Sequence, residues 1–220
     1  MKFNYDGKLL DIEIEKLIIA GWTGRDVEQR NKHIIELAEI GVTPPISTPC
    51  FYSVSKSMAT NEPSIFVSSK YTSGEAEVFL IFHNNEIYVG VGSDHTDREV
   101  ETSDVLLSKQ CCHKPMSIDL WKYTDVYDHW DNLVLQSYII YENEVVLYQN
   151  DTLSNLLHPE VILKKYEEEI SSIESGFVMF LGTIPLETSL RYSDTFKVRL
   201  YDSVREKSLT HEYNVIAKLS

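Results

Sequence analysis

Residues 75–94 read EAEVFLIFHNNEIYVGVGSD, and this stretch decides the architecture that we predict for the chain. Two predicted strands, 75–82 and 86–92, flank Asn84-Asn85, a pair that tolerates the positive φ of a tight hairpin turn. With the turn centred on this pair, residues that face each other across the hairpin have numbers that sum to 169, as 84 and 85 do. Glu75 is then expected to face Asp94, and Glu77 is expected to face Gly92.

Three carboxylates are therefore predicted to converge at the open end of this hairpin. Side chains alternate between the two faces of a strand, so Glu75 and Glu77 project the same way, with Asp94 opposite Glu75. Facing carboxylates repel each other, by roughly 3 kcal/mol per pair at ~5 Å and an effective dielectric of ~20. A bound cation would remove this repulsion. Oxygen-only ligands favour Mg²⁺, Mn²⁺ or Ca²⁺ over zinc.

A solvated acidic face is the alternative interpretation of the same residues. The chain has 34 acidic residues, so some of them will lie together by chance. The metal hypothesis also depends on the register of the hairpin, because a slip of one residue would turn Asp94 to the other face.

The rest of the chain predicts a mixed β-rich (α+β) fold in a single domain over residues 1–220. Helices are expected at 26–40, followed by Gly41 and Pro44-Pro45, and at 159–173, which begins with proline and is followed by Gly176. Strands are expected at 9–19, 133–141, 144–149, 177–181, 195–201 and 209–217, with a second turn at Glu142-Asn143. There is no strand–helix alternation of the kind that a doubly wound sheet requires.

The composition limits the classes of partner. There are 34 acidic against 20 basic residues, a formal net charge of −14, so a nucleic acid or an anionic membrane surface would be repelled. Three cysteines, at 50, 111 and 112, show no C-x-x-C spacing, and we interpret them as reduced thiols. No apolar run reaches 18 residues, so we expect a cytoplasmic protein without a membrane span.

Five short motifs between residues 73 and 185 occur in the order typical of the fumarylacetoacetate hydrolase superfamily, and with an upstream element the resemblance extends from about residue 20. Ser73-Gly74-Glu75-Ala76-Glu77 resembles its E-x-E element, and residues 92–99, GSDHTDRE, resemble its G-N-D-[VW]-[ST]-A-R-D element. Three further motifs follow. Ser108-Lys109 is similar to the segment of the active-site lysine, and residues 149–159 are similar to the Q-x-x-x-T segment with the proline-led helix after it. Gly182-Thr183-Ile184-Pro185 resembles the G-T-P loop. Departures from the second element include Ser93 in place of Asn and Asp97 in place of Ala.

An H-x-x-E pair lies upstream, at His33 and Glu36, several residues later than in the family pattern. The segment before it, Gly21-Trp22-Thr23-Gly24-Arg25-Asp26, also differs from that pattern. Residues three apart on a helix can touch, so Glu36 could orient His33. An ordinary surface His–Glu pair is the alternative.

The resemblance implies a β-roll with peripheral helices and a metal-dependent hydrolase that cleaves a carbon–carbon bond in a 1,3-diketo or acylpyruvate-like acid. It implies that Glu75, Glu77 and Asp94 hold Mg²⁺, or else Mn²⁺ or Ca²⁺, which stabilises an enolate of the substrate. Roles follow for other residues: His33 as general base, oriented by Glu36; Lys109 as oxyanion stabiliser; Arg98 and Thr183 as substrate-binding residues. It also implies a homodimer acting on a small carboxylic acid.

Two other functions are compatible with the same residues. Decarboxylation, hydration or isomerisation of a 2-oxo acid would use the same cation and the same lysine. A non-catalytic binding module for a metal or a small ligand could keep the carboxylates and lack the base.

Overall fold

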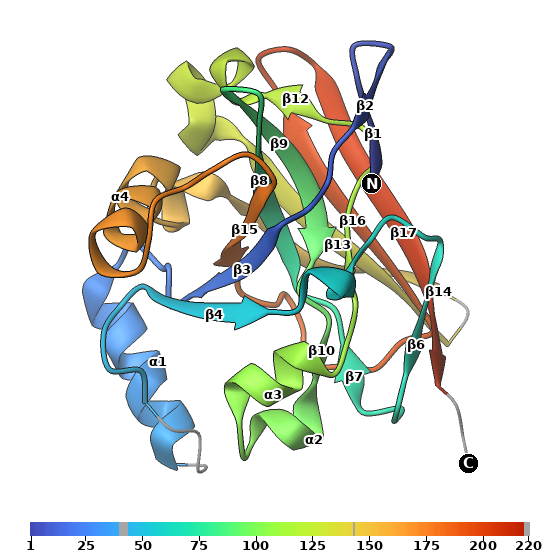
Figure 1. Ribbon diagram of the computed structural model, residues 1–220. Helices are drawn as coiled ribbons and strands as arrows, with labels where there is room; N and C mark the ends of the chain where they lie inside the picture. Colours follow the sequence, from blue (N-terminus) through green and yellow to red (C-terminus); the bar gives the residue numbers. More distant parts are fainter. Residues whose placement is uncertain (40–43, 143, 218–220) are drawn as a thin grey trace.

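Two large β-sheets face each other in the structure, a computed structural model, and the α-helices of the described residues lie around one end and one side of them (Figure 1). The structure describes residues 1–39, 44–142 and 144–217, apart from the side chains of His33 and Leu37. Within these ranges, no helix is long and apolar enough to cross a membrane.

The first sheet has the strand order β12-β9-β8-β15-β3-β4. Its strands are β12 (Trp121–Lys122), β9 (Glu86–Ser93), β8 (Ala76–His83), β15 (Phe177–Thr183), β3 (Lys16–Gly21) and β4 (Cys50–Val54). Strand β15 runs parallel to β3 and antiparallel to β8, so a strand from the C-terminal half of the chain lies between strands from the N-terminal half.

The second sheet has the order β14-β13-β16-β17-β6. Its strands are β14 (Glu144–Thr152), β13 (Val134–Tyr141), β16 (Thr195–Asp202), β17 (Lys207–Ala217) and β6 (Ser64–Val67). Three short ladders complete the strands: β1 (Lys2–Tyr5) with β2 (Lys8–Asp11), β7 (Thr72–Ser73) with β10 (Thr96–Asp97), and β5 (Ala59–Thr60) with β11 (Lys114–Pro115). The mixed β-rich architecture predicted from the sequence is confirmed.

The two predicted helices are present as α1 (Val27–Glu39) and α4 (Pro159–Glu169). The prediction placed the end of the second helix at residue 173, which is wrong, because the helix ends at Glu169 and its C-cap, Ile170, has a non-helical backbone. The predicted strand at 9–19 is also wrong, since β2 ends at Asp11 and β3 begins at Lys16. Residues 40–43 and 143 lie outside the described residues.

Two short helices were not predicted, α2 (Arg98–Glu101) and α3 (Val105–Gln110). Each begins at an aspartate whose carboxylate accepts backbone N–H groups of the first turn, Asp97 for α2 and Asp104 for α3. This capping satisfies donors that a short helix would otherwise leave unpaired. The two helices lie together beyond the ends of β8 and β9 (Figure 1).

The hairpin of β8 and β9 has the predicted register. Asn84 and Asn85 have φ angles of 50° and 63°, as a two-residue hairpin turn of this hand requires. Ala76 pairs with Ser93 and Glu77 with Gly92, so every pair of the ladder keeps the predicted sum. The turn therefore fixes which side chains meet at the open end of the hairpin.

Both faces of β8 are buried, in two different clusters of the core. Val78 and Leu80 pack in the cluster that lies between the two large sheets. Phe79 and Ile81, on the opposite face, pack in a second cluster with residues from the N-terminal segment, such as Phe3. Burial on both faces explains why β8 is continuously apolar rather than alternating.

Gly90 makes room for one of these core rings, and we expect Gly90→Ala to destabilise the fold. Gly90 and Phe79 are cross-strand partners, and a Cβ at Gly90 would lie 2.0 Å from Cζ of Phe79. We expect the free energy of unfolding to fall by about 1–3 kcal/mol, as overpacking of a core commonly costs. Urea unfolding measures it. Gly24→Ala is the control, since a Cβ there meets nothing within 4 Å, and its effect should stay within about 0.5 kcal/mol. Equal effects of the two variants would contradict the prediction.

Candidate metal centre

Three carboxylates meet at the open end of the β8–β9 hairpin, as the register predicted. Glu75 directly precedes β8, Glu77 lies in β8, and Asp94 directly follows β9, where its N–H donates to the carbonyl of Glu75 at 3.0 Å. One oxygen from each carboxylate lies within 4.8 Å of the others. Glu77 and Asp94 are buried and Glu75 is half-buried, so the alternative of a solvated acidic face is wrong.

Two buried lysines hold the carboxylate of Asp94. Lys109, on α3, donates a hydrogen bond to Oδ2, and Nζ of Lys114, on β11, lies 2.9 Å from Oδ1. Burial alone would raise the pKa of Asp94, but these two ammonium groups outweigh it and hold the pKa well below its usual range. Asp94 is therefore ionised in the folded protein.

Lys114 is a residue that the sequence analysis missed. It is fully buried and also donates to the carbonyl of His95 at 2.7 Å, which ties β11 to the backbone beside Asp94. Its sequence context, His113-Lys114-Pro115, carries no signal of this position. Only the docking of β11 beside β9 brings it there.

Glu77 has the opposite electrostatic environment to Asp94. Its Oε2 accepts a hydrogen bond from the N–H of Gly182 at 2.8 Å. Burial, and then the neighbouring charge of Asp94, raise the pKa of Glu77 well above its usual range, although Lys109 acts in the other direction. A further positive charge at the cluster would therefore stabilise the ionised form of Glu77.

Arg98 holds Glu75 in place. Its Nη2 lies 3.0 Å from Oε1 of Glu75, its Nε donates to Oγ of Ser73 at 2.7 Å, and its Nη1 donates to Oε2 of Glu101 at 2.8 Å. All of these contacts are to protein groups. The arrangement orients a carboxylate of the cluster, and a substrate contact by Arg98 stays a prediction.

Thr183 is likewise occupied by protein contacts. Its hydroxyl donates to the carbonyl of Ala76 and accepts from Nε2 of Gln149, both at 2.8 Å. Gln149 is buried and also accepts from the N–H of Ala76 at 2.9 Å, so it joins the second sheet to the start of β8. In the sequence, Gln149 is marked only as the first residue of the 149–159 motif. The predicted contact between Thr183 and a substrate carboxylate is not tested by this geometry.

The donor set fits a hard divalent cation. All three converging groups are carboxylates, and Oδ1 of Asp94 is buried without a well-directed hydrogen bond from any described residue. Oxygen donors at this spacing are the ligands that Mg²⁺, Mn²⁺ and Ca²⁺ prefer.

A sequence-family model described as "Protein of unknown function (DUF2848)" matches residues 20–213. The chain belongs to this family. No curated protein matches the chain at a significant level.

Solved structures give the fold of this DUF2848 chain. A 2-keto-3-deoxyarabinonate dehydratase is 15% identical over 95% of the chain and 76% of its own length, with a TM-score of 0.68. The 5-carboxymethyl-2-hydroxymuconate delta-isomerase from Mycobacterium smegmatis is 16% identical over 98% and 85%, with a TM-score of 0.67. A protein provisionally described as a fumarylacetoacetate isomerase/hydrolase from Oleispira antarctica is 16% identical over 98% and 100%, with a TM-score of 0.68. The DUF2848 chain thus has the fold of the fumarylacetoacetate hydrolase superfamily, as the motifs predicted.

The predicted base lies on α1 of the DUF2848 chain. The side chain of His33 lies outside the described residues, so its proposed role stays a prediction. Glu36 is exposed on the same helix, 3.7 Å from Nζ of Lys32. The geometry brings together the three carboxylates and Lys109, with Arg98 beside Glu75 and Thr183 opposite Glu77 on β15.

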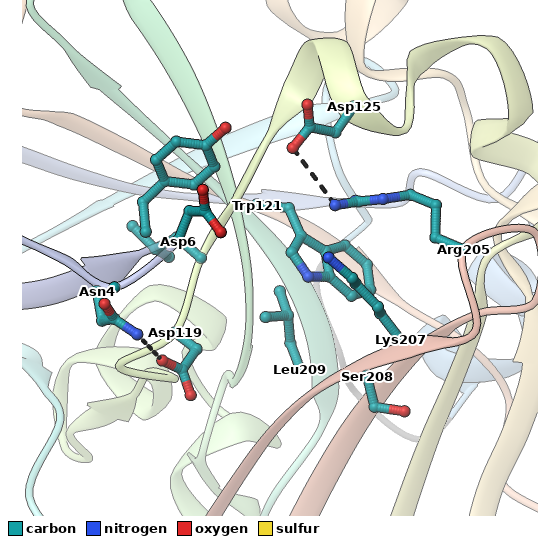
Figure 2. Close-up of a pocket in the computed structure, with 12 residues that line it drawn as sticks. Asn4, Asp6, Asp119, Trp121, Asp125, Arg205, Lys207, Ser208 and Leu209 are labelled. Atoms are coloured by element: carbon teal, nitrogen blue, oxygen red, sulfur yellow. Dashed lines mark hydrogen bonds and ion pairs between the residues drawn. The ribbon is translucent and has the colours of Figure 1, made fainter.

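A cavity of about 460 Å³ lies elsewhere on the DUF2848 chain and shares no lining residue with the carboxylates. It is formed by the β1–β2 turn, the segment around Asp119 and Trp121, and the β16–β17 turn (Figure 2). Two of the charged residues that line it form an ion pair with each other, since Nη2 of Arg205 lies 3.5 Å from Oδ2 of Asp125. Among the described residues, none that lines this cavity belongs to the candidate metal centre.

Lys114→Met tests the buried charge pair of the DUF2848 chain. Removal of one partner from a buried ion pair leaves the other charge under-compensated, so we expect a loss of about 3–5 kcal/mol in the free energy of unfolding. Urea unfolding in EDTA measures this loss without a contribution from bound metal. Lys122→Met is the control, because its pair with Glu86 at 3.0 Å is partly exposed and should contribute at most about 1 kcal/mol. A loss no larger than that of the control would show that Asp94 does not depend on Lys114.

Proposed function

We propose that this protein is a metal-dependent hydrolase that cleaves a carbon–carbon bond in a 1,3-diketo or acylpyruvate-like acid. The observation that carries the proposal is the convergence of Glu75, Glu77 and Asp94 within 4.8 Å, beside the ammonium group of Lys109. A cluster of this kind suits a substrate with two neighbouring oxygen donors, as a 2-oxo acid has.

Glu75, Glu77 and Asp94 would hold the cation, and Mg²⁺ is the ion that we propose first. When bound, such an ion supplies a Lewis acid for the oxygen atoms of a 2-oxo acid. The chain's part in this is to fix the carboxylates: Arg98 holds Glu75, Lys114 holds Asp94, and the N–H of Gly182 holds Glu77. Ligands fixed in this way lose little freedom when a cation binds.

Lys109 would stabilise negative charge that develops on a substrate oxygen. Burial would lower the pKa of its ammonium group, but Asp94, Glu75 and Glu77 together raise the pKa above its ordinary value. The side chain is therefore a permanent cation at neutral pH, suited to electrostatic stabilisation and unsuited to proton abstraction. A separate base is needed, and the family resemblance assigns this role to His33, oriented by Glu36.

A second candidate function is isomerisation or dehydration of a 2-oxo acid by the same residues. Two of the similar solved structures are a dehydratase and an isomerase by name, which favours this alternative over a binding module. The carboxylates and Lys109 would have the same roles in each reaction. Assays of the Mg²⁺-loaded protein against acylpyruvates and against 3-deoxy-2-oxo acids separate the two candidates by their products.

Metal-linked stability is the first expected property of the proposed centre. A ligand that binds only the folded state at a hundred times its Kd adds about 2.7 kcal/mol of stability. For a domain of this size, that raises the Tm by roughly 5–10 °C. Melting scans in EDTA and then in millimolar Mg²⁺ or Mn²⁺ measure the shift.

Glu75→Ala should lose this shift, and Glu86→Ala, at the turn end of the same hairpin, should keep it. No shift for the wild type, or the same shift for Glu75→Ala, would refute the proposed centre.

The proposed roles also predict a division of labour between the base and the carboxylates. His33→Ala should leave metal binding intact while turnover falls by roughly 10²–10⁴-fold. Glu77→Ala should lose metal and activity together, because one of three carboxylate ligands is gone. Glu36→Gln should have a milder effect, since it keeps a hydrogen-bonding group beside the imidazole.

Calorimetric titration with Mn²⁺ and a steady-state assay on the same preparations measure both quantities. Full activity of His33→Ala would mean that the base lies elsewhere.

A further inference from the structure

A buried chain of hydrogen bonds connects the turn of the candidate metal centre to the second sheet. The hydroxyl of Tyr213, on β17, donates to Oγ of Ser93 at 2.8 Å. The same hydroxyl lies 2.9 Å from Nδ1 of His95, whose Nε2 lies 2.9 Å from Oγ1 of Thr72. All four residues are at most 3% exposed.

The direction of each bond follows from the hydrogens available. Tyr213 has one hydroxyl hydrogen, which goes to Ser93, so the phenolic oxygen must accept from Nδ1–H of His95. Nε2 of the neutral imidazole then accepts from the hydroxyl of Thr72. The chain runs from Thr72 through His95 and Tyr213 to Ser93.

This chain holds the backbone on both sides of Asp94. Ser93 and His95 are its two neighbours in sequence, and Oγ of Ser93 also accepts from the N–H of Glu75 at 3.2 Å. The hydroxyl of Tyr213 therefore holds both Ser93, which accepts a hydrogen bond from the backbone of Glu75, and His95, which follows Asp94. The two strand ends that carry these carboxylates are joined through side chains as well as through the ladder.

We propose that Tyr213 and His95 are positioning residues, which hold Glu75 and Asp94 at the spacing that a divalent cation requires. The inference rests on the proposed function, because it presumes that the carboxylates bind a cation. Neither residue has to touch the cation or the substrate. Outer hydrogen-bond partners of metal ligands commonly contribute 10–100-fold to metal affinity.

Tyr213→Phe tests the proposal, since it removes one hydroxyl and keeps the ring that packs on Phe196. Mn²⁺ titrations followed by the EPR signal of the free ion give the Kd for the wild type, for Tyr213→Phe and for the control Tyr201→Phe. Tyr201 lies on the neighbouring strand β16, where its ring stacks with Arg199. We expect Mn²⁺ affinity to fall at least about tenfold for Tyr213→Phe and to stay unchanged for the control.

Urea unfolding in EDTA separates positioning from loss of fold, because a positioning role lowers affinity in a protein that still unfolds cooperatively. Should Tyr213→Phe fail to fold, Thr72→Val takes its place, since it removes only the far end of the chain and nearly keeps the side-chain shape. Unchanged affinity in the folded variant overturns the inference and leaves the proposed function standing. A wild type that binds no Mn²⁺ refutes the proposed function itself, and the inference falls with it.

Discussion

The ionised carboxylate of Asp94, held between the ammonium groups of Lys109 and Lys114, is the interaction on which the arrangement of the site depends. A buried, unpaired carboxylate would cost far more than the marginal stability of a domain. The segment from Arg98 to Pro115 has to dock at the end of the β8–β9 hairpin, because it carries the cations that face the three carboxylates. The docking of α2, α3 and β11 is thus as much an electrostatic requirement as a packing one.

The hairpin itself was predictable because its determinants are local. Asn84-Asn85 sets the turn, the turn sets the register, and the register places Glu75 beside Asp94. None of these steps needs a contact from a distant part of the chain. The same logic gave α1 and the start of α4, where a proline occupies the first helical position.

The rest of the site was not predictable because it is assembled from contacts across long stretches of sequence. Lys114 reaches Asp94 through the docking of β11 beside β9, and Tyr213 reaches Ser93 across 120 residues. Neither residue has a sequence context that distinguishes it from an ordinary lysine or an ordinary strand tyrosine. The α2 and α3 helices are too short to show a helical period, so the element that carries Lys109 could not be recognised from its pattern.

The structure also changes the physical case for a metal. Facing carboxylates suggested a cation as the remedy for their repulsion, but the chain supplies Arg98, Lys109 and Lys114 as three positive charges of its own. Repulsion alone therefore no longer requires a metal. What favours one is the convergence of three carboxylates, one oxygen of each lying within 4.8 Å of the others, which is the donor set that a hard divalent cation prefers.

The net charge of this cluster affects its attraction for an anionic substrate. With the three carboxylates ionised, their negative charges are balanced by those of Arg98, Lys109 and Lys114, so the cluster is close to neutral. A divalent cation would make this cluster positive by about two charges. The proposed substrate, a 1,3-diketo or acylpyruvate-like acid, is an anion, and the chain as a whole carries a net charge of −14, which repels anions. A neutral cluster of ligands and lysines, made positive only by its metal, would provide the local attraction that such a substrate needs on an acidic protein.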